Sequence, residues 1–135
     1  VDENSRANVR LLGGIASVVF LLSHPSPVIQ MLSAWALTNL SLDDNNRLLI
    51  LKNGALKQLV PILQNSDNYD VLTKSLWLLT NLASEETHRK FLNACGVNQI
   101  LAELLRTIKT GMSPTDIQLL LELTKPLRNM LLDLE

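Results

Sequence analysis

Cysteine, aromatic residues and net charge are all scarce in this sequence, and each scarcity excludes a class of protein. With a single cysteine, Cys95, among 135 residues, the chain can form no internal disulfide, cysteine zinc cluster or redox CxxC motif. Its 12 Lys and Arg oppose 13 Asp and Glu, so a net charge of -1 leaves no basic excess to neutralise a phosphate backbone. We therefore expect an intracellular protein, cytoplasmic or nuclear, that binds no nucleic acid.

Long hydrophobic runs are missing as well. No charged residue lies between Arg10 and Asp43, but the apolar part of this stretch, residues 11–22, has only 12 residues. A membrane-spanning helix needs about 20, and residues 23–27 then interrupt the run with Ser, His and Pro, which favour a turn. The sequence therefore predicts no membrane association.

Catalytic groups are few and poorly placed. His88 and Cys95 are seven residues apart, which separates them by about 10 Å along a helix. His24 lies in a Ser/Pro turn with no carboxylate near it in sequence to orient it. HExxH, P-loop and GxGxxG motifs are absent. We predict that the protein is not an enzyme and uses no cofactor and no metal.

What the sequence does contain is 47% hydrophobic residues, in a chain long enough for one domain, and an internal repeat. A shift of 42 residues superposes six identical residues: Ser33, Trp35, Leu37, Thr38, Asn39 and Leu40 on Ser75, Trp77, Leu79, Thr80, Asn81 and Leu82. The same shift carries Arg47 onto Arg89 and Gly54 onto Gly96. A period of this length indicates a repeat protein.

Glycines mark the same corner in each repeat. Apolar residues follow Gly14, Gly54 and Gly96 at offsets of one, five and eight, which is a helical spacing. Each glycine is expected to be the left-handed residue that joins a short first helix to a second one.

A third, longer helix is predicted to complete each unit. Ser26 and Pro27 have the chemistry of an N-cap and first helical residue, as do Ser113 and Pro114, and residues 65–68 predict a turn in the middle unit. The units then span about 1–43, 44–85 and 86–135. The last diverges, because residues 107–113 lengthen it.

The segments GGIASVVFLL, SAWALTNLSLDDNN and NGALKQLVPIL resemble armadillo repeats, most specifically in the first two units. The resemblance implies an all-α, right-handed superhelical solenoid of three three-helix repeats. It also implies a scaffold without enzymatic activity, which binds an extended partner along a groove lined by the third helices. We expect the chain to be a fragment of a longer array with further repeats.

The third helices have two different faces. At about 100° per residue, one stripe, which we expect to face the core, consists of Ile29, Ser33, Leu37 and Leu40, and in the second unit of Val71, Ser75, Leu79 and Leu82. The opposite face, which we expect to line the groove, carries Met31, Trp35, Thr38 and Asn39, then Thr73, Trp77, Thr80 and Asn81.

On this outer face a Trp is followed four residues later by an Asn, twice. An Asn amide can pair with the C=O and N–H of an extended peptide, and an indole face can carry a Lys or Arg side chain for about 0.5–2 kcal/mol. The two pairs are similar to the peptide-binding array of importin-α, which implies that Asn39 and Asn81 clamp a ligand backbone. In the third unit Asn129 aligns with these Asn residues, but Lys125 takes the Trp position.

Simpler roles remain open for all of these residues. A Trp at helical spacing more often packs in a core, and a mid-helix Thr more often bonds back to its own helix. The acidic pairs Asp43/Asp44 and Glu85/Glu86 could attract a basic ligand at the groove rim, or could complement the N-terminal dipole of the next helix.

The leading functional hypothesis is therefore a protein-interaction scaffold that binds a peptide or partner protein. An importin-α-like adaptor for basic localisation peptides is the alternative. A third possibility is a purely structural spacer within a larger protein.

Overall fold

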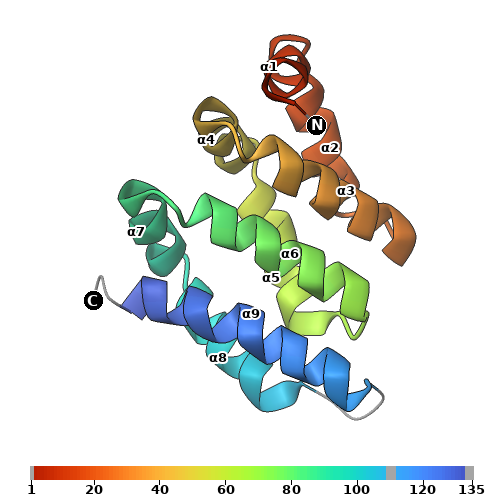
Figure 1. The fold of residues 1–135 in the computed structure, drawn as a ribbon, viewed down its shortest axis with the longest axis vertical. Coiled ribbons are helices and arrows are strands. Elements are labelled where there is room, and N and C mark those ends of the chain that lie inside the picture. The colour runs from red at the N-terminus through yellow and green to blue at the C-terminus, as the bar shows by residue number, and fades with distance from the viewer. Residues whose placement is uncertain (1, 109–111, 133–135) are drawn as a thin grey trace.

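The computed structural model describes residues 2–108 and 112–132, and every regular element within them is a helix (Figure 1). Two shorter helices followed by a long one occur three times. They are α1 (Glu3–Leu11), α2 (Gly14–Leu21) and α3 (Pro27–Leu40); α4 (Asp44–Lys52), α5 (Ala55–Asn65) and α6 (Tyr69–Leu82); and α7 (Glu86–Ala94), α8 (Val97–Thr107) and α9 (Pro114–Leu132). The predicted all-α solenoid is confirmed.

The long helices lie side by side in one layer. Helix α3 packs on α6 and α6 packs on α9, and Figure 1 shows the three running in the same direction across the molecule. Helices α2, α5 and α8 pack behind them as a second layer. A solenoid of this kind presents one continuous surface made of successive third helices.

The starts of the long helices agree with the sequence prediction. Pro27 opens α3 after Ser26, and Pro114 opens α9, where the Ser113 Oγ accepts a hydrogen bond from the Asp116 N–H at 3.1 Å. In the middle unit α5 ends at Asn65, and Asn68 Oδ1 accepts from the Val71 N–H at 3.0 Å to cap α6. Of the connection predicted at residues 107–113, residues 109–111 lie outside the described part of the chain.

The glycine corner differs from the prediction by one residue in the first unit. Gly13, not Gly14, has the left-handed conformation with φ of 75°, in the same role as Gly54 (85°) and Gly96 (79°). Gly14 is the first residue of α2, where an added Cβ would lie 2.9 Å from Cγ1 of Val9. Two adjacent glycines therefore serve two needs, one conformational and one steric.

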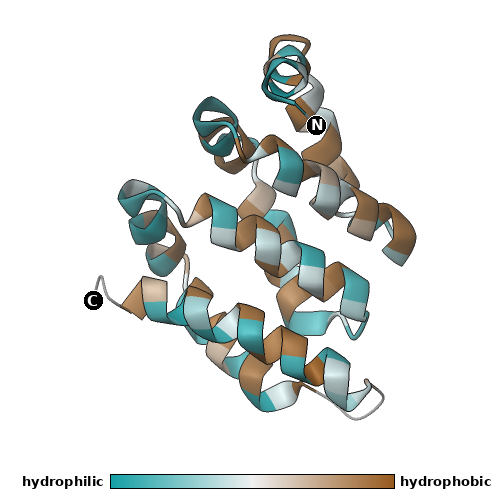
Figure 2. Cartoon of the chain, viewed as in Figure 1, coloured by the Kyte–Doolittle hydropathy of each residue, from teal (hydrophilic) through white to brown (hydrophobic). Residues whose placement is uncertain are grey.

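The core follows the predicted spacing. All nine residues at offsets of one, five and eight from Gly14, Gly54 and Gly96 are buried: Ile15, Val19 and Leu22; Ala55, Leu59 and Ile62; Val97, Leu101 and Leu104. In Figure 2, α2 and α3 are mostly hydrophobic, whereas α1, α4 and α7 are largely hydrophilic. Across the residues that the structure describes, no helix combines the length and the hydrophobicity needed to cross a bilayer.

Candidate peptide-binding groove

The two tryptophans lie on the surface formed by the long helices, outside the core. Trp35 of α3 is 47% exposed and Trp77 of α6 is 39% exposed, while Leu37 and Leu79, two residues further on, are fully buried. This placement agrees with the predicted outward face. It places two large apolar rings where a molecule lying across α3 and α6 would meet both of them.

A lysine that the sequence analysis missed lies between these rings. The Nζ atom of Lys74, on α6, is 4.8 Å from the centroid of the Trp35 ring and 4.6 Å from that of the Trp77 ring. Lys74 aligns with Leu32 in the repeat, so the internal comparison could not reveal it. The available signal was its position three residues before Trp77, because residues so spaced on a helix are neighbours.

The Asn81 side chain forms hydrogen bonds between two repeats. Its Nδ2 donates to the Thr38 carbonyl at 3.1 Å and to the Ser41 Oγ at 3.0 Å, at the C-terminal end of α3. Both amide hydrogens are therefore used within the protein. The expectation that this amide is free to clamp a ligand is corrected, since only its oxygen remains available.

Asn39, at the equivalent position of the first unit, is in a different situation. Its side chain is half-buried, and its amide forms no hydrogen bond with any residue that the structure describes. No third helix precedes α3 within the described residues, so nothing there plays the part that Thr38 and Ser41 play for Asn81.

The remaining predicted groove residues are less accessible than expected. Thr73 is only 3% exposed and donates to the Tyr69 carbonyl at 2.8 Å, so its assignment to the groove is wrong. The reason is that α6 packs between α3 and α9 and buries more of its circumference than an angular plot of one helix can predict. Met31 is partly buried against the core.

Thr38 and Thr80 both bond back to their own helices. Thr38 Oγ1 donates to the Ala34 carbonyl at 2.7 Å, and Thr80 Oγ1 donates to the Leu76 carbonyl at 2.9 Å. Thr38 Oγ1 also lies 3.4 Å from the Lys74 carbonyl on α6. These hydroxyl hydrogens are therefore engaged within the helices.

Asp43, predicted at the groove rim, makes its contacts within the protein. It caps α4 by accepting hydrogen bonds from the N–H groups of Asn45 at 2.8 Å and Asn46 at 3.4 Å, and it pairs with Arg10 at 2.9 Å. Burial of the Asp43 carboxyl acts to raise its pKa, but the hydrogen bonds from Arg10 and the backbone outweigh that effect and hold the pKa below 3.8. The carboxylate is thus charged, and its Oδ1 makes all of these contacts.

The other three acidic residues are also paired with bases. Arg47 contacts both Asp44 and Glu85, the latter at 3.0 Å, and donates to the Ser41 carbonyl at 2.8 Å. Glu86 pairs with Lys90 at 3.4 Å on the exposed side of α7. Arg47 therefore links the end of one repeat to the start of the next.

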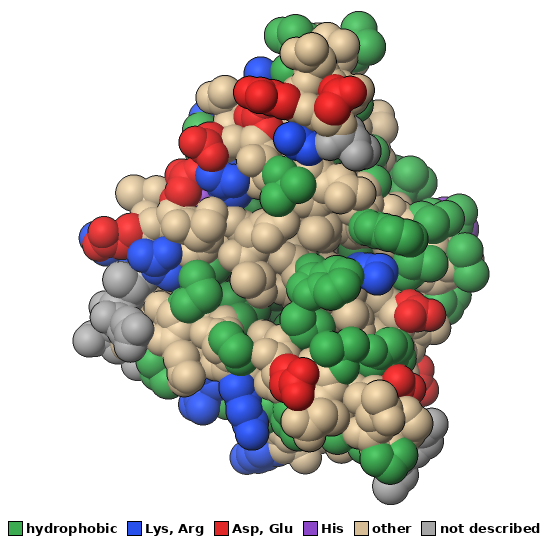
Figure 3. All heavy atoms as spheres, in the orientation of Figure 1, with side chains coloured by type: hydrophobic (Ala, Val, Ile, Leu, Met, Phe, Trp, Pro, Cys, Tyr) green, Lys and Arg blue, Asp and Glu red, His purple; other side chains and the backbone are tan. Residues whose placement is uncertain are grey.

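Many of the charged side chains in view lie along one edge, while a basic side chain lies within the apolar patch and acidic ones border it (Figure 3). Figure 3 shows acidic and basic side chains alternating along the edge where α4 and α7 lie, and hydrophobic side chains gathered over α3 and the adjoining part of α6. The neutralised acidic edge and the tryptophan surface are therefore separate features of the molecule.

The sequence matches the model of the armadillo/beta-catenin-like repeat family twice, over residues 6–42 and 43–84. The chain belongs to the armadillo repeat family. These two armadillo segments contain Trp35, Trp77 and Lys74. No curated protein matches the chain. Armadillo repeats in general mediate protein–protein interactions, and the family is typically a non-enzymatic scaffold.

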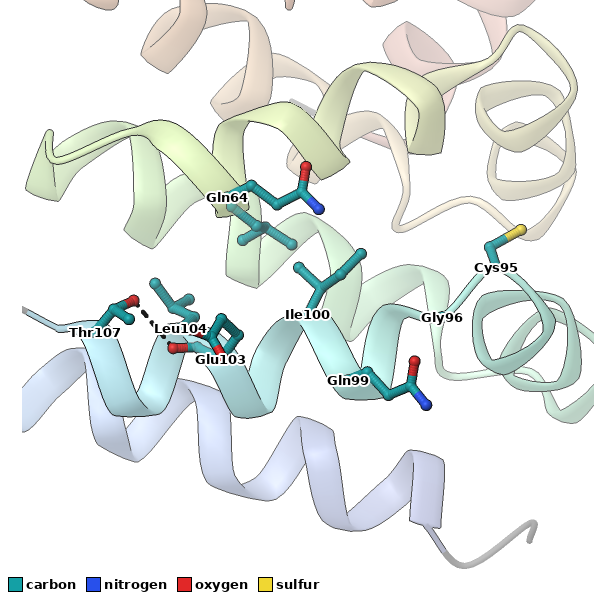
Figure 4. Close-up of a pocket in the computed structure, with 9 residues that line it drawn as sticks. Gln64, Cys95, Gly96, Gln99, Ile100, Glu103, Leu104 and Thr107 are labelled. Carbon is teal, nitrogen blue, oxygen red and sulfur yellow. Dashed lines mark hydrogen bonds between the residues drawn. The ribbon is translucent and has the colours of Figure 1, made fainter.

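A hollow lies between the armadillo second helices α5 and α8 (Figure 4), and neither tryptophan lines it. It is lined by Gln64, Gln99, Glu103 and the exposed free thiol of Cys95, among others. His88 does not join Cys95, because it is buried and its Nε2 lies 3.7 Å from Glu85. Among the described side chains, no group of three or more His, Cys, Asp or Glu is placed to hold a metal ion.

Proposed function

We propose that this armadillo chain binds an extended segment of a partner protein along the surface of α3 and α6, with Trp35 and Trp77 as its main contacts. The observation that carries the proposal is the half-exposure of both indoles at equivalent positions of adjacent helices. Tryptophan is highly buried on average, and it is enriched among the residues that dominate binding energy at interfaces.

The repeat spacing suits an extended peptide. Helices packed side by side lie about 8–10 Å apart, and an extended chain advances about 3.3 Å per residue. About three ligand residues would therefore span the distance from Trp35 to Trp77. The Asn81 oxygen would accept a hydrogen bond from an N–H of the peptide backbone.

The importin-α-like alternative has less support. In such a groove the space between tryptophans of successive repeats would receive a basic side chain of the ligand. Here Lys74 of the chain itself lies between the rings. The spacer alternative gives no reason for two indoles to stay exposed. We favour a scaffold that acts in the cytoplasm or nucleus, where the Cys95 thiol would stay reduced.

Further armadillo repeats before α1 are part of the proposal. The first unit exposes Leu11, Leu12 and Phe20, each more than 70% accessible, as the covered face of an internal repeat would if its neighbour were absent. In such an array a preceding third helix would accept hydrogen bonds from the Asn39 amide, as α3 accepts them from the Asn81 amide. The indoles would then carry the ligand contact.

The test is a peptide array followed by calorimetric titration of the peptides that bind. Trp35→Ala and Trp77→Ala should each weaken binding at least about tenfold, as truncation of interface anchors does. Phe91→Ala is the matched control, because Phe91 is an aromatic residue of similar exposure, 45%, on α7. Equal losses in all three variants, or peptides that bind the tryptophan variants as tightly as the wild type, would contradict the proposal.

A further inference from the structure

Lys74 is a cation that has no anionic partner among the residues that the structure describes. No carboxylate among the described residues lies within 4.0 Å of its ammonium group, although other cations on the molecule, such as Arg47 and Lys90, have one. Its ammonium carries three donors. Two carboxylates on α6 and α9 form no ion pair with it: Asp70, one turn earlier on α6, is exposed, and Glu122 of α9 accepts from the Gln118 amide at 3.0 Å.

The two indoles hold this cation in place. A ring centroid lies within 5 Å of Nζ on each of two helices, so the lysine tip is positioned by α3 as well as by its own α6. Each cation–π contact favours the charged tip at the ring face, and the methylene stem of a lysine packs well on apolar surface. A side chain held in this way loses little further freedom when a ligand binds it.

We propose that Lys74 makes the groove selective for an acidic peptide: the carboxylate of a ligand Asp or Glu binds the Lys74 ammonium while neighbouring ligand residues cover Trp35 and Trp77. The inference rests on the proposed groove function and names the class of ligand that the groove accepts.

The same geometry disfavours a basic ligand. The position between the two rings is already filled by a lysine side chain. A ligand Lys or Arg would have to displace Lys74 or approach its like charge. Lys74 is thus a specificity-determining residue, and the charge preference of this groove is the reverse of the one that the paired tryptophans alone imply.

The experiment is a fluorescence titration. Trp35 and Trp77 are the only tryptophans of the chain, so selectively excited tryptophan fluorescence reports on this site. The probes are three alanine-based peptides of about eight residues, identical except for two central residues, which are Glu, Gln or Lys. We expect the Glu peptide to bind about fivefold or more tightly than the Gln peptide, and the Lys peptide to bind most weakly, with the difference reduced by added salt.

Four variants separate the charge from the packing. Lys74→Met keeps the apolar stem and should abolish the preference for the Glu peptide, and Lys74→Arg should retain it. Lys74→Ala should open the position between the rings and raise the affinity of the Lys peptide above that of the Glu peptide. Lys57→Met, at an exposed lysine of α5, is the matched control and should bind as the wild type does. Each variant is compared at a temperature where circular dichroism shows it folded.

The outcomes distinguish a failure of the Lys74 assignment from a failure of the groove proposal. If the Gln or Lys peptide binds the wild type as tightly as the Glu peptide, or if Lys74→Met keeps the preference, the assignment of Lys74 is overturned while the groove stands. If no peptide of any charge changes the fluorescence, the groove proposal itself is overturned, and the inference with it.

Discussion

Asn39 and Asn81 occupy the same position in successive repeats, yet the structure predicts different consequences when each is replaced by alanine. Asn81 donates two hydrogen bonds to the end of α3, whereas the Asn39 amide has no hydrogen-bond partner among the described residues. A hydrogen bond contributes about 1 kcal/mol net, and leaving a half-buried acceptor unpaired costs more. The Thr38 carbonyl retains the Ser41 Oγ as a donor at 2.7 Å, which limits the loss.

We therefore expect Asn81→Ala to lower the free energy of unfolding by about 1–2 kcal/mol, and Asn39→Ala to change it by less than about 0.5 kcal/mol. Both variants gain the same helix propensity from alanine, so the difference between them isolates the contacts. For a chain of this size the corresponding difference in Tm is about 3–8 °C.

The assay is urea unfolding followed by circular dichroism, with the slope of the transition checked for constancy between variants. If the two variants lose equal stability, the Asn81 bonds do not link the repeats as described. If Asn39→Ala is the more damaging variant, the Asn39 amide has a structural role that the described residues do not show.

Three further predictions concern stability and assembly. The pKa of Asp43 in the folded protein is lowered from its ordinary value of 3.8, so its contribution to stability is present above that pH and is lost as the pH falls through the folded pKa. Asp43→Asn keeps the N-cap acceptor but cannot titrate. In an acid titration of unfolding, this variant should therefore lose less stability than the wild type. Gly54→Ala should lower the free energy of unfolding by about 1–2 kcal/mol because φ of Gly54 is 85°, and Gly54→Asn should lower it by less. Thermal melts compare the two variants, and equal melting temperatures of the Ala variant and the wild type would refute the left-handed corner. Phe20, at 73% exposure, should promote self-association, so Phe20→Glu should reduce the sedimentation coefficient at high concentration, and an unchanged coefficient would mean that this face is not the contact.

The features predictable from the sequence are those that depend on local spacing. The offsets after the glycines identify buried residues such as Val19, Leu59 and Leu101 because a helix repeats every 3.6 residues whatever surrounds it. The starts of α3 and α9 at Pro27 and Pro114 follow from the fixed φ of proline, which is again a local property.

The features that the sequence could not reveal depend on neighbouring repeats. Thr73 and Met31 have the same angle on their helices, but α6 lies between two third helices and buries Thr73. Asn81 finds its partners 40 and 43 residues away, and Lys74 lies between rings of two helices. The exact glycine of the first corner was missed because two adjacent glycines look alike in sequence.

In the proposed complex, a partner segment lies across Trp35 and Trp77. The most direct measurement is a two-dimensional NMR titration with the tightest peptide from the array, because two tryptophans give two indole N–H signals that can be followed separately. We expect both indole signals to shift together and to saturate at the same peptide concentration. A peptide that binds and saturates while both indole signals stay in place would contradict this proposal.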